Sequence, residues 1–442
     1  MTVAKKDIFG GSLLARPGKG LKGELTVPGD KSISHRAVML ASIASGVTEV
    51  TGFLEGEDNL STIGALRAMG IVIEHKKDSG IVVVNGKGMR GLTEPADVID
   101  AGNSGTTTRL ITGLLSAQPF FSVITGDASL RKRPMKRVVE PLTLMGASIS
   151  GRNNGNNLPL AIAGQRLKGI TYKTPVASAQ LKSSLMLAGI YADGATIIEE
   201  PEKSRDHTER MLRLFGADVK IDKNSVRVQS TNDLIGCKIN VPGDISSAAF
   251  FIVGAMITPA SALLIRGVGV NPTRTGIIDV LRKMGGSVEL QNERVASGEP
   301  VADLLVKTSS LKGTEITGTG LLPAIDEFPI ICIAAVFAEG TTKITGAKEL
   351  RVKESDRIAV MAEALSRVGV RTTELPDGIV IEGVGSAAIK GGAIESHGDH
   401  RIAMSMAMAA LRSDNGVEID GAASVDVSFP GFFDQLDRVR GS

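Results

Sequence analysis

The chain has 442 residues, of which 42% are hydrophobic and 22% charged, and its formal net charge is +2. This length exceeds what one hydrophobic core usually supports, so two or three domains are expected. With 3% aromatic residues and no Trp, the chain offers little for stacking on bases, which argues against nucleic acid as a partner.

Signals for the cellular compartment are few. The first residues, 1–7, lack the apolar core of a signal peptide. The longest apolar stretch, about 248–265, is interrupted near Pro259, which predicts a buried helix followed by a strand and no membrane span. Cys237 and Cys332 are too few for a disulfide framework or a zinc site. These features favour a cytoplasmic protein whose two thiols lie in the core.

The first strong helix signal lies in residues 27–36. A Gly-Asp turn opens an apolar helix expected from about Ile33 to Ser45, with Gly46 ending it. Lys31 and Arg36 then lie near the helix N-terminus, where the helix dipole disfavours cations. Either these side chains extend into solvent from an ordinary helix start, or an anion binds there.

The same pattern recurs along the chain. Six times a turn of small or charged residues opens a strongly apolar helix, at spacings of about 65 to 85 residues. The six openings end at Arg36, Arg109, Ser183, Ser247, Pro329 and Arg401. A second series of amphipathic helices closes on Gly70, Gly146, Gly216, Gly285 and Gly369. Each repeat therefore combines two helices with short strands.

The repeats predict two domains. A fully apolar helix must be buried on all sides, and three such helices can be buried together. The near copies at 27–32 and 241–246 open the first and fourth repeats, so we place the chain crossings there. One domain is expected to span 29–242, and the other to combine 1–28 with 243–442. Two matched lobes joined at two Pro-Gly points suggest a hinge that closes on a ligand.

Basic residues recur at these helix openings. Arg109, Lys182, His400 and Arg401 follow the second, third and sixth openings. One basic helix start is ordinarily solvated, but several at equivalent places indicate a site for more than one anion.

Carboxylates lie among the cations. Asp326 and Glu327 open the fifth apolar helix, where a capping role for Asp326 is the alternative to a catalytic one. Lys353 and Arg357 are four residues apart and are expected on one helical face. Glu354 lies between them, and a surface ion pair is its alternative role.

A metal site is not expected. His397 and His400 are close in the sequence, but no cluster of further ligands accompanies them.

Eight motifs occur in the order typical of the 5-enolpyruvylshikimate-3-phosphate synthase family, which the chain resembles over essentially its whole length. They are PGDKSISHR (28–36), GNSGT (102–106) with Arg109, KRP (132–134), SAQ (178–180), RDHTE (205–209), IDE (325–327), RVKESDR (351–357) and DHR (399–401).

The resemblance implies an α/β fold of two similar inside-out domains, each built of three βαβαββ repeats, with the active site in the cleft between them. It also implies transfer of the carboxyvinyl group of phosphoenolpyruvate to the 5-hydroxyl of shikimate 3-phosphate, with release of phosphate and with no metal or organic cofactor. The implied partners are these two small molecules, without nucleic acid or membrane, and we expect a monomer.

The resemblance also assigns site residues by position. Shikimate 3-phosphate would be bound by Lys31, Ser32, Arg36, Ser178, Ala179, Gln180, Ser204, Arg205, Asp326 and Lys353. Phosphoenolpyruvate would be bound by Lys31, Gly105, Arg133, Gln180, Arg357 and Arg401. Glu354 is expected to shuttle a proton to and from the methylene carbon, and Asp326, helped by Lys31 or Lys353, to deprotonate the hydroxyl.

The motif at 205–209 resembles a branch of the family whose members vary in tolerance of the inhibitor glyphosate. Tolerant members of that branch can carry Ala where this chain has Gly105. We therefore expect no steric block beside phosphoenolpyruvate.

Two other functions stay open. The related enolpyruvyl transferases that act on UDP-N-acetylglucosamine usually carry a Cys in a mobile loop of the first lobe, which neither Cys237 nor Cys332 matches. A non-enzymatic anion-binding scaffold would explain the repeats, but not the carboxylates placed among the cations.

Overall fold

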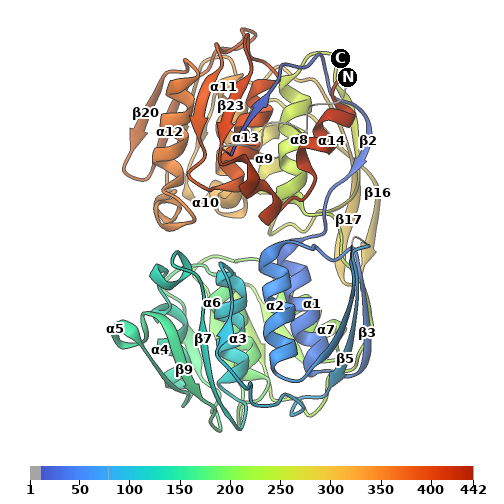
Figure 1. The fold of residues 1–442 in the computed structure, drawn as a ribbon, viewed down its shortest axis with the longest axis vertical. Helices are drawn as coiled ribbons and strands as arrows, with labels where there is room; N and C mark the ends of the chain where they lie inside the picture. The colour runs from blue at the N-terminus through green and yellow to red at the C-terminus, as the bar shows by residue number, and fades with distance from the viewer. Residues whose placement is uncertain (1–10, 78, 442) are drawn as a thin grey trace. The chain divides into compact units, whose positions relative to one another are not determined.

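The computed structural model describes residues 11–77 and 79–441, so the signal-peptide argument on residues 1–7 lies outside this part. The described chain divides into two compact units (Figure 1). Unit 1 contains 11–28, 243–294 and 300–441, and unit 2 contains 29–77, 79–242 and 295–299. The boundaries after Pro28 and Pro242 coincide with the crossings placed from the sequence. The grouping of 295–299 with unit 2 was not anticipated.

Unit 2 contains three similar runs of helices and strands. The first run comprises α1 (Lys31–Ile43), β3 (Ser45–Thr51), α2 (Glu57–Ala68), β4 (Val72–Lys76) and β5 (Ile81–Lys87). The second comprises β6 (Ile99–Asp100), α3 (Gly105–Leu115), β7 (Phe121–Thr125), η1 (Leu130–Lys132), α4 (Lys136–Leu144), β8 (Ser148–Gly151), α5 (Arg152–Gly155) and β9 (Asn157–Ala163). The third comprises β10 (Thr171–Lys173), α6 (Ala179–Gly189), β11 (Thr196–Glu199), α7 (His207–Leu214), β12 (Val219–Asp222) and β13 (Ser225–Val228), and β14 (Lys238–Asn240) follows it.

Unit 1 repeats this order. Its first run comprises α8 (Ile245–Ile257), β15 (Ala262–Gly269), α9 (Gly276–Lys283), β16 (Val288–Ala296) and β17 (Glu299–Lys307). The second comprises β18 (Glu315–Ile316), α10 (Gly318–Leu321), η2 (Leu322–Glu327), α11 (Phe328–Val336), β19 (Thr341–Ile344), η3 (Lys348–Val352), α12 (Arg357–Arg367), β20 (Thr372–Leu375) and β21 (Gly378–Glu382). The third comprises β22 (Gly392–Glu395), α13 (His400–Ala410), β23 (Val417–Asp420), η4 (Ala422–Val427) and α14 (Phe432–Val439); β1 (Ser12–Ala15) and β2 (Lys22–Thr26) precede all of these in the chain.

A strand completes a sheet of its own unit just before each crossing. The run that starts with α1 lacks a strand of its own before this helix, and β14 takes that place by pairing parallel to β3. In the same way, β2 pairs parallel to β15 in unit 1. Each crossing therefore follows a strand that completes a sheet of the unit that the chain is about to leave. Only a chain that crosses twice can place both strands in this way.

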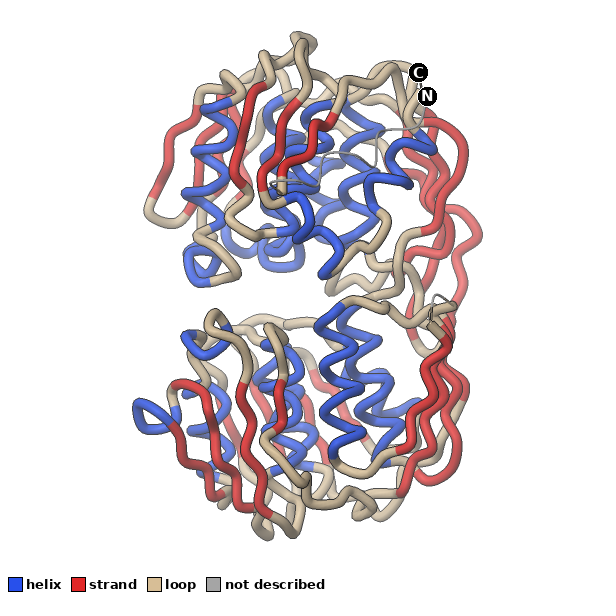
Figure 2. The backbone as a smooth tube through the Cα atoms, viewed as in Figure 1, coloured by secondary structure: helices blue, strands red, loops and turns tan. Residues whose placement is uncertain are grey.

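The sheets of each unit surround a helical interior, as the peripheral strands in Figure 2 show. The six apolar helices α1, α3, α6, α8, α11 and α13 are buried over nearly their whole length. Every residue of α8 and of α11 is buried. The apolar stretch that begins near residue 248 is, as expected, a buried helix followed by a strand. Within the described residues, no helix is both long and apolar enough to cross a membrane.

Helix termini follow the sequence signals with some corrections. The glycines predicted to close the amphipathic helices, Gly70, Gly146, Gly216, Gly285 and Gly369, all have positive φ angles between 81° and 100°, the backbone region that glycine adopts without steric cost.

The first helix differs from its prediction. It begins at Lys31, two residues earlier than expected, because the carboxylate of Asp30 accepts a hydrogen bond from the backbone N–H of Ile33. It ends at Ile43, and Gly46 lies in β3, so this glycine does not end the helix. Cys332 lies in the core as expected, whereas Cys237 is half-buried.

The crossing imposes a close backbone approach between Gly29 and Gly52. A Cβ atom built on Gly29 would lie 1.8 Å from the backbone oxygen of Gly52, which cannot move away without displacing the chain. We expect Gly29→Ala to destabilise unit 2 by roughly 1–3 kcal/mol, measured by urea unfolding followed by circular dichroism.

The matched control is Gly64→Ala, in the exposed face of α2, where an added Cβ meets nothing within 4 Å. This change is expected to stabilise the protein by up to about 1 kcal/mol, because alanine is the better helix former. Equal effects of the two substitutions would contradict the account of Gly29.

Candidate functional site

The starts of α1, α3 and α6 in unit 2 carry most of the residues expected to bind anions. Lys31 is the first residue of α1, and its Nζ lies 2.5 Å from Asp58 Oδ2. Both side chains are partly exposed. Ser32 is half-buried beside Lys31. The ammonium of Lys31 is therefore held by a carboxylate at the solvent boundary, where it can still reach a ligand.

Arg36 is buried at the first turns of α1 and is held by neutral groups. Its Nε donates to Thr208 Oγ1 at 2.6 Å, its Nη2 to Ser183 Oγ at 2.7 Å, and its Nη1 to the carbonyl of Ser32 at 2.9 Å. Burial lowers the pKa of Arg36 to about 10, although the nearby Glu209 opposes this effect. The guanidinium remains cationic at neutral pH.

A second chain of contacts joins α3 to α6. Arg109 Nη1 donates to Gln180 Oε1 at 2.8 Å, and Gln180 Nε2 donates to Thr106 Oγ1 at 3.0 Å. Gly105 opens α3, and a Cβ built there would lie 2.8 Å from Arg109 Nη1 and 3.4 Å from Arg133 Nη1. Two guanidinium groups therefore lie close to the backbone of Gly105.

Ser178 and Ser204 present hydroxyls close to the start of α6. Ser178 is the N-cap residue of this helix, and its Oγ accepts from the N–H of Leu181 at 3.4 Å. Ser204 Oγ is buried, and within the described part of the chain no group hydrogen-bonds to it. Arg205, next in sequence, is half-buried. A buried hydroxyl without a partner is costly unless a ligand or water satisfies it.

The structure corrects the role suggested for Lys182. Its Nζ lies 2.7 Å from Glu200 Oε2 and 2.8 Å from Glu209 Oε1, and all three side chains are almost fully buried. Burial alone would lower the pKa of Lys182, but its attraction to Glu209 and Glu200 outweighs burial and raises it. The ammonium of Lys182 is paired with two internal carboxylates and is not available to bind an external anion.

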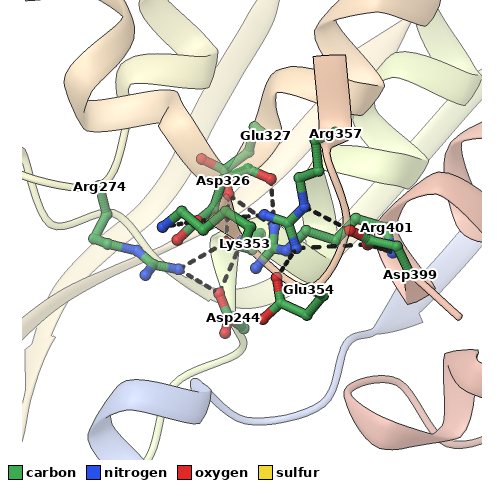
Figure 3. Close-up of polar contacts among 10 residues, drawn as sticks. Asp244, Arg274, Asp326, Glu327, Lys353, Glu354, Arg357, Asp399 and Arg401 are labelled. Atoms are coloured by element: carbon green, nitrogen blue, oxygen red, sulfur yellow. Dashed lines mark hydrogen bonds and ion pairs between the residues drawn. The ribbon is translucent and has the colours of Figure 1, made fainter. Parts of the chain in front are cut away.

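The carboxylates expected to act in the reaction lie in unit 1, among cations (Figure 3). Asp326 Oδ1 lies 3.7 Å from Lys353 Nζ and 3.7 Å from Arg357 Nη1. Glu354 Oε2 lies 2.7 Å from Arg357 Nη2, and the side chain of Glu354 is 31% exposed. The structure brings these four residues together, as the sequence suggested.

Two local predictions about this group are wrong. Asp326 lies within η2 and does not cap α11, whose N-cap residue, Glu327, makes no capping bond with its side chain. Lys353 and Arg357 do not share a helical face, because α12 begins only at Arg357. Their common contact with Asp326 brings them together instead.

Asp399 holds Arg357 in place and was not singled out from the sequence. Its Oδ2 accepts from Arg357 Nε at 2.8 Å and from Ser355 Oγ at 3.1 Å, while its Oδ1 caps α13 through the N–H of Arg401. Burial alone would raise the pKa of Asp399, but Arg357 and His400 outweigh burial and lower it. The Gly-Asp turn before α13 was the sequence feature that could have identified Asp399.

Arg401 also contacts a second group of charged and polar side chains in unit 1. Its Nη1 donates to the carbonyl of Asp326 at 2.8 Å and lies 3.4 Å from Glu327 Oε1. Glu327 also accepts from Ser246, which accepts in turn from Arg274 Nη2 at 2.8 Å. Asp244 caps α8 and accepts from Arg274 at 2.7 Å. The repeated Gly-Asp opening could have identified Asp244, whereas nothing local pointed to Arg274.

Within the described residues, no group of three or more His, Cys, Asp and Glu side chains could hold a metal ion. The two histidines considered as metal ligands have different surroundings. His397 lies 3.5 Å from Glu395 and 3.7 Å from Glu363, and His400 is the first residue of α13.

Two units of layered repeats, with cations and carboxylates gathered at helix starts, define a protein with the enolpyruvyl transferase fold. The enolpyruvyl transferase NikO from Streptomyces tendae shares this fold, with a TM-score of 0.79 at 17% identity over 97% of this chain and 98% of that one.

The family itself follows from closer relatives. Residues 15–436 match the model of EPSP synthase (3-phosphoshikimate 1-carboxyvinyltransferase), and the chain belongs to this family. The 3-phosphoshikimate 1-carboxyvinyltransferase of Geobacter sulfurreducens is 59% identical over 97% of this chain and 99% of that protein. That of Pelobacter propionicus is 58% identical over the same shares. The EPSP synthase structure from Acinetobacter baumannii has a TM-score of 0.89 and 52% identity, covering 97% and 98% of the two chains.

The family and fold predicted from the eight motifs are therefore confirmed. The two alternative functions, a UDP-N-acetylglucosamine transferase and a non-enzymatic scaffold, are not favoured by these relatives.

The buried pair of Asp399 and Arg357 makes stability depend on pH. The lowered pKa of Asp399 means that its contribution is fully present above the ordinary aspartate range, about 3.9, and is lost as pH falls through its folded value. We expect Asp399→Asn to lower the unfolding free energy of unit 1 by roughly 3–5 kcal/mol at pH 7, and by progressively less below pH about 4.

Urea unfolding between pH 3 and 8 measures this difference. Asp414→Asn, at an exposed position, serves as the control and should change little at any pH. If the unfolding free energy lost in Asp399→Asn stays constant across the pH range, the charge of the carboxylate is not the cause of the stabilisation.

Proposed function

We propose that this protein catalyses transfer of the carboxyvinyl group of phosphoenolpyruvate to the 5-hydroxyl of shikimate 3-phosphate, releasing phosphate. The observation that carries the proposal is near full-length identity of 56–59% to relatives that bear the name 3-phosphoshikimate 1-carboxyvinyltransferase. The reaction belongs to aromatic amino acid biosynthesis through the shikimate pathway. Its substrates are two small anions, and we propose that the protein acts on them as a cytoplasmic monomer.

Shikimate 3-phosphate is assigned mainly to unit 2. Ser178, the Ala179 backbone, Gln180, Ser204 and Arg205 would hold its phosphate, and Ser32 and Arg36 its carboxylate. The hydroxyl of Ser204, which has no hydrogen-bond partner among the described residues, and the N-terminus of α6 support this assignment, because helix N-termini and hydroxyls favour phosphate oxygens.

Phosphoenolpyruvate is assigned to cations of both units. Arg133 and the backbone at Gly105 come from unit 2, and Arg357 and Arg401 from unit 1. Guanidinium groups suit carboxylate and phosphate because they donate two parallel hydrogen bonds. Lys31 and Gln180 would contact both substrates.

The chemistry requires two proton transfers. The Glu354 carboxyl would give its proton to the methylene carbon of phosphoenolpyruvate, while the 5-hydroxyl oxygen attacks the neighbouring carbon and loses its proton to Asp326, helped by Lys31 or Lys353. The tetrahedral intermediate then expels phosphate as Glu354 takes a proton back from the methyl group, restoring the double bond. The partial exposure of Glu354 and the placement of Asp326 beside Lys353 support these roles.

Glu354→Gln tests the proton shuttle. The amide keeps the shape and a contact with Arg357 but cannot exchange a proton, so turnover is expected to fall by about 10²–10⁴-fold while shikimate 3-phosphate still binds. Phosphate release measures turnover and calorimetry measures binding.

The control for this test is Glu363→Gln, which alters an exposed glutamate paired with Arg367 on α12 and should retain full activity. Near-normal turnover of Glu354→Gln would remove Glu354 from the mechanism.

Gly105→Ala tests the assignment of phosphoenolpyruvate. The added methyl would contact the guanidinium ends of Arg109 and Arg133, so these flexible groups must shift by a few tenths of an ångström. We expect a higher KM for phosphoenolpyruvate and weaker inhibition by glyphosate, with the KM for shikimate 3-phosphate nearly unchanged. An inhibition curve identical to that of the unmodified protein would contradict the steric account.

A further inference from the structure

We propose that Glu200 is a positioning residue that joins the two segments carrying Ser178 and Ser204, and so shapes the pocket for the phosphate of shikimate 3-phosphate. The inference rests on the proposed function, because it takes the assignment of that phosphate to these serines as given.

The geometry of Glu200 is that of a bridge. It directly follows β11, and its two carboxylate oxygens bond to different segments. Oε1 accepts from the backbone N–H of Ser178 at 3.3 Å, and Oε2 accepts from the backbone N–H of Ser204 at 3.3 Å. One side chain therefore ties the N-cap residue of α6 to the loop that precedes α7.

The Glu200 bridge fixes the segments whose hydroxyls, on Ser178 and Ser204, would face a phosphate. Ser178 Oγ accepts from the N–H of Leu181 as the helix cap, which leaves its own proton for a ligand oxygen. Ser204 Oγ is buried and unsatisfied within the described chain. The two hydroxyls come from segments that are 26 positions apart in sequence, so their relative placement depends on what joins those segments.

The charge of Glu200 would oppose a phosphate if it were not neutralised. Lys182 supplies this compensation, because its Nζ lies 2.7 Å from Glu200 Oε2 and 3.4 Å from the carbonyl of Ser204. Burial raises the pKa of Glu209, and its attraction to Lys182 offsets this only partly. Lys182 thus offsets charge that Glu200 would otherwise present to a phosphate, and it shares its own charge with Glu209.

A carboxylate is needed in this place because both backbone groups and the ammonium are donors. In Glu200→Gln the amide nitrogen would face one of these donors and could not accept from it. We expect the KM for shikimate 3-phosphate to rise about 10- to 100-fold, which corresponds to loss of a hydrogen bond to a charged group. The KM for phosphoenolpyruvate and kcat should stay within about twofold.

The matched control is Glu199→Gln. This neighbouring glutamate is more exposed and pairs with the exposed Lys173 at 3.3 Å, so its loss should change neither KM. Both variants are first compared with the unmodified protein by circular dichroism and thermal unfolding.

If Glu200→Gln fails to fold, Glu200→Asp repeats the test, because it keeps a carboxylate for Lys182 while the shorter side chain cannot reach the N–H groups of Ser178 and Ser204 together. The same selective rise in the KM for shikimate 3-phosphate is expected in that variant.

Calorimetry with shikimate 3-phosphate and with shikimate, which lacks the phosphate, separates the possible outcomes. Selective loss of affinity for shikimate 3-phosphate in the variant supports the inference. An unchanged preference for shikimate 3-phosphate over shikimate overturns it, as does an equal loss for both ligands, which would indicate a general structural role. If the unmodified protein shows no preference for shikimate 3-phosphate, the proposed function fails and this inference falls with it.

Discussion

The burial of six fully apolar helices is the constraint on which the rest of the structure depends. Helices such as α8 and α11 have no solvent face, so their sides cannot carry ligand-binding groups. Only their ends can, and the N-terminal ends bring free N–H groups and the positive end of the helix dipole. The architecture that builds the core therefore places anion-binding groups at the starts of these helices, where capping side chains also hold the backbone.

The two units use their cations differently. In unit 2, Arg36 donates to hydroxyls and a carbonyl, and Arg109 and Arg133 donate to the amide oxygens of Gln180 and Asn103. Neutral acceptors orient a guanidinium without cancelling its charge. In unit 1, Arg357 and Arg274 bind the carboxylates of Asp399 and Asp244. Among these arginines, those of unit 2 thus have neutral groups as hydrogen-bond acceptors, whereas Arg357 and Arg274 of unit 1 have carboxylates.

Sequence reasoning succeeded where the signal was local and repeated. The apolar helices, their Gly-ended amphipathic partners and the chain crossings after Pro28 and Pro242 all follow from patterns within a few residues, reinforced by repetition. The grouping of Asp326, Lys353, Glu354 and Arg357 was predicted correctly. The predicted reason for it was wrong, because spacing alone cannot tell a helix from a 3₁₀ turn followed by a new helix start.

Contacts between residues far apart in the sequence could not be predicted from local patterns. Lys182 follows a helix opening just as Arg109 does, yet Lys182 is neutralised by Glu200 and Glu209 while Arg109 bonds to Gln180. The difference is set by what lies opposite each cation in the folded unit, since a buried ammonium is tolerated only when carboxylates compensate for its lost hydration. Glu200 and Glu209 come from the end of β11 and from α7, and neither position is marked as a partner of α6 by any local pattern. The same helix start therefore has two possible uses, binding an external anion or holding an internal carboxylate, and the partners supplied by tertiary packing decide between them.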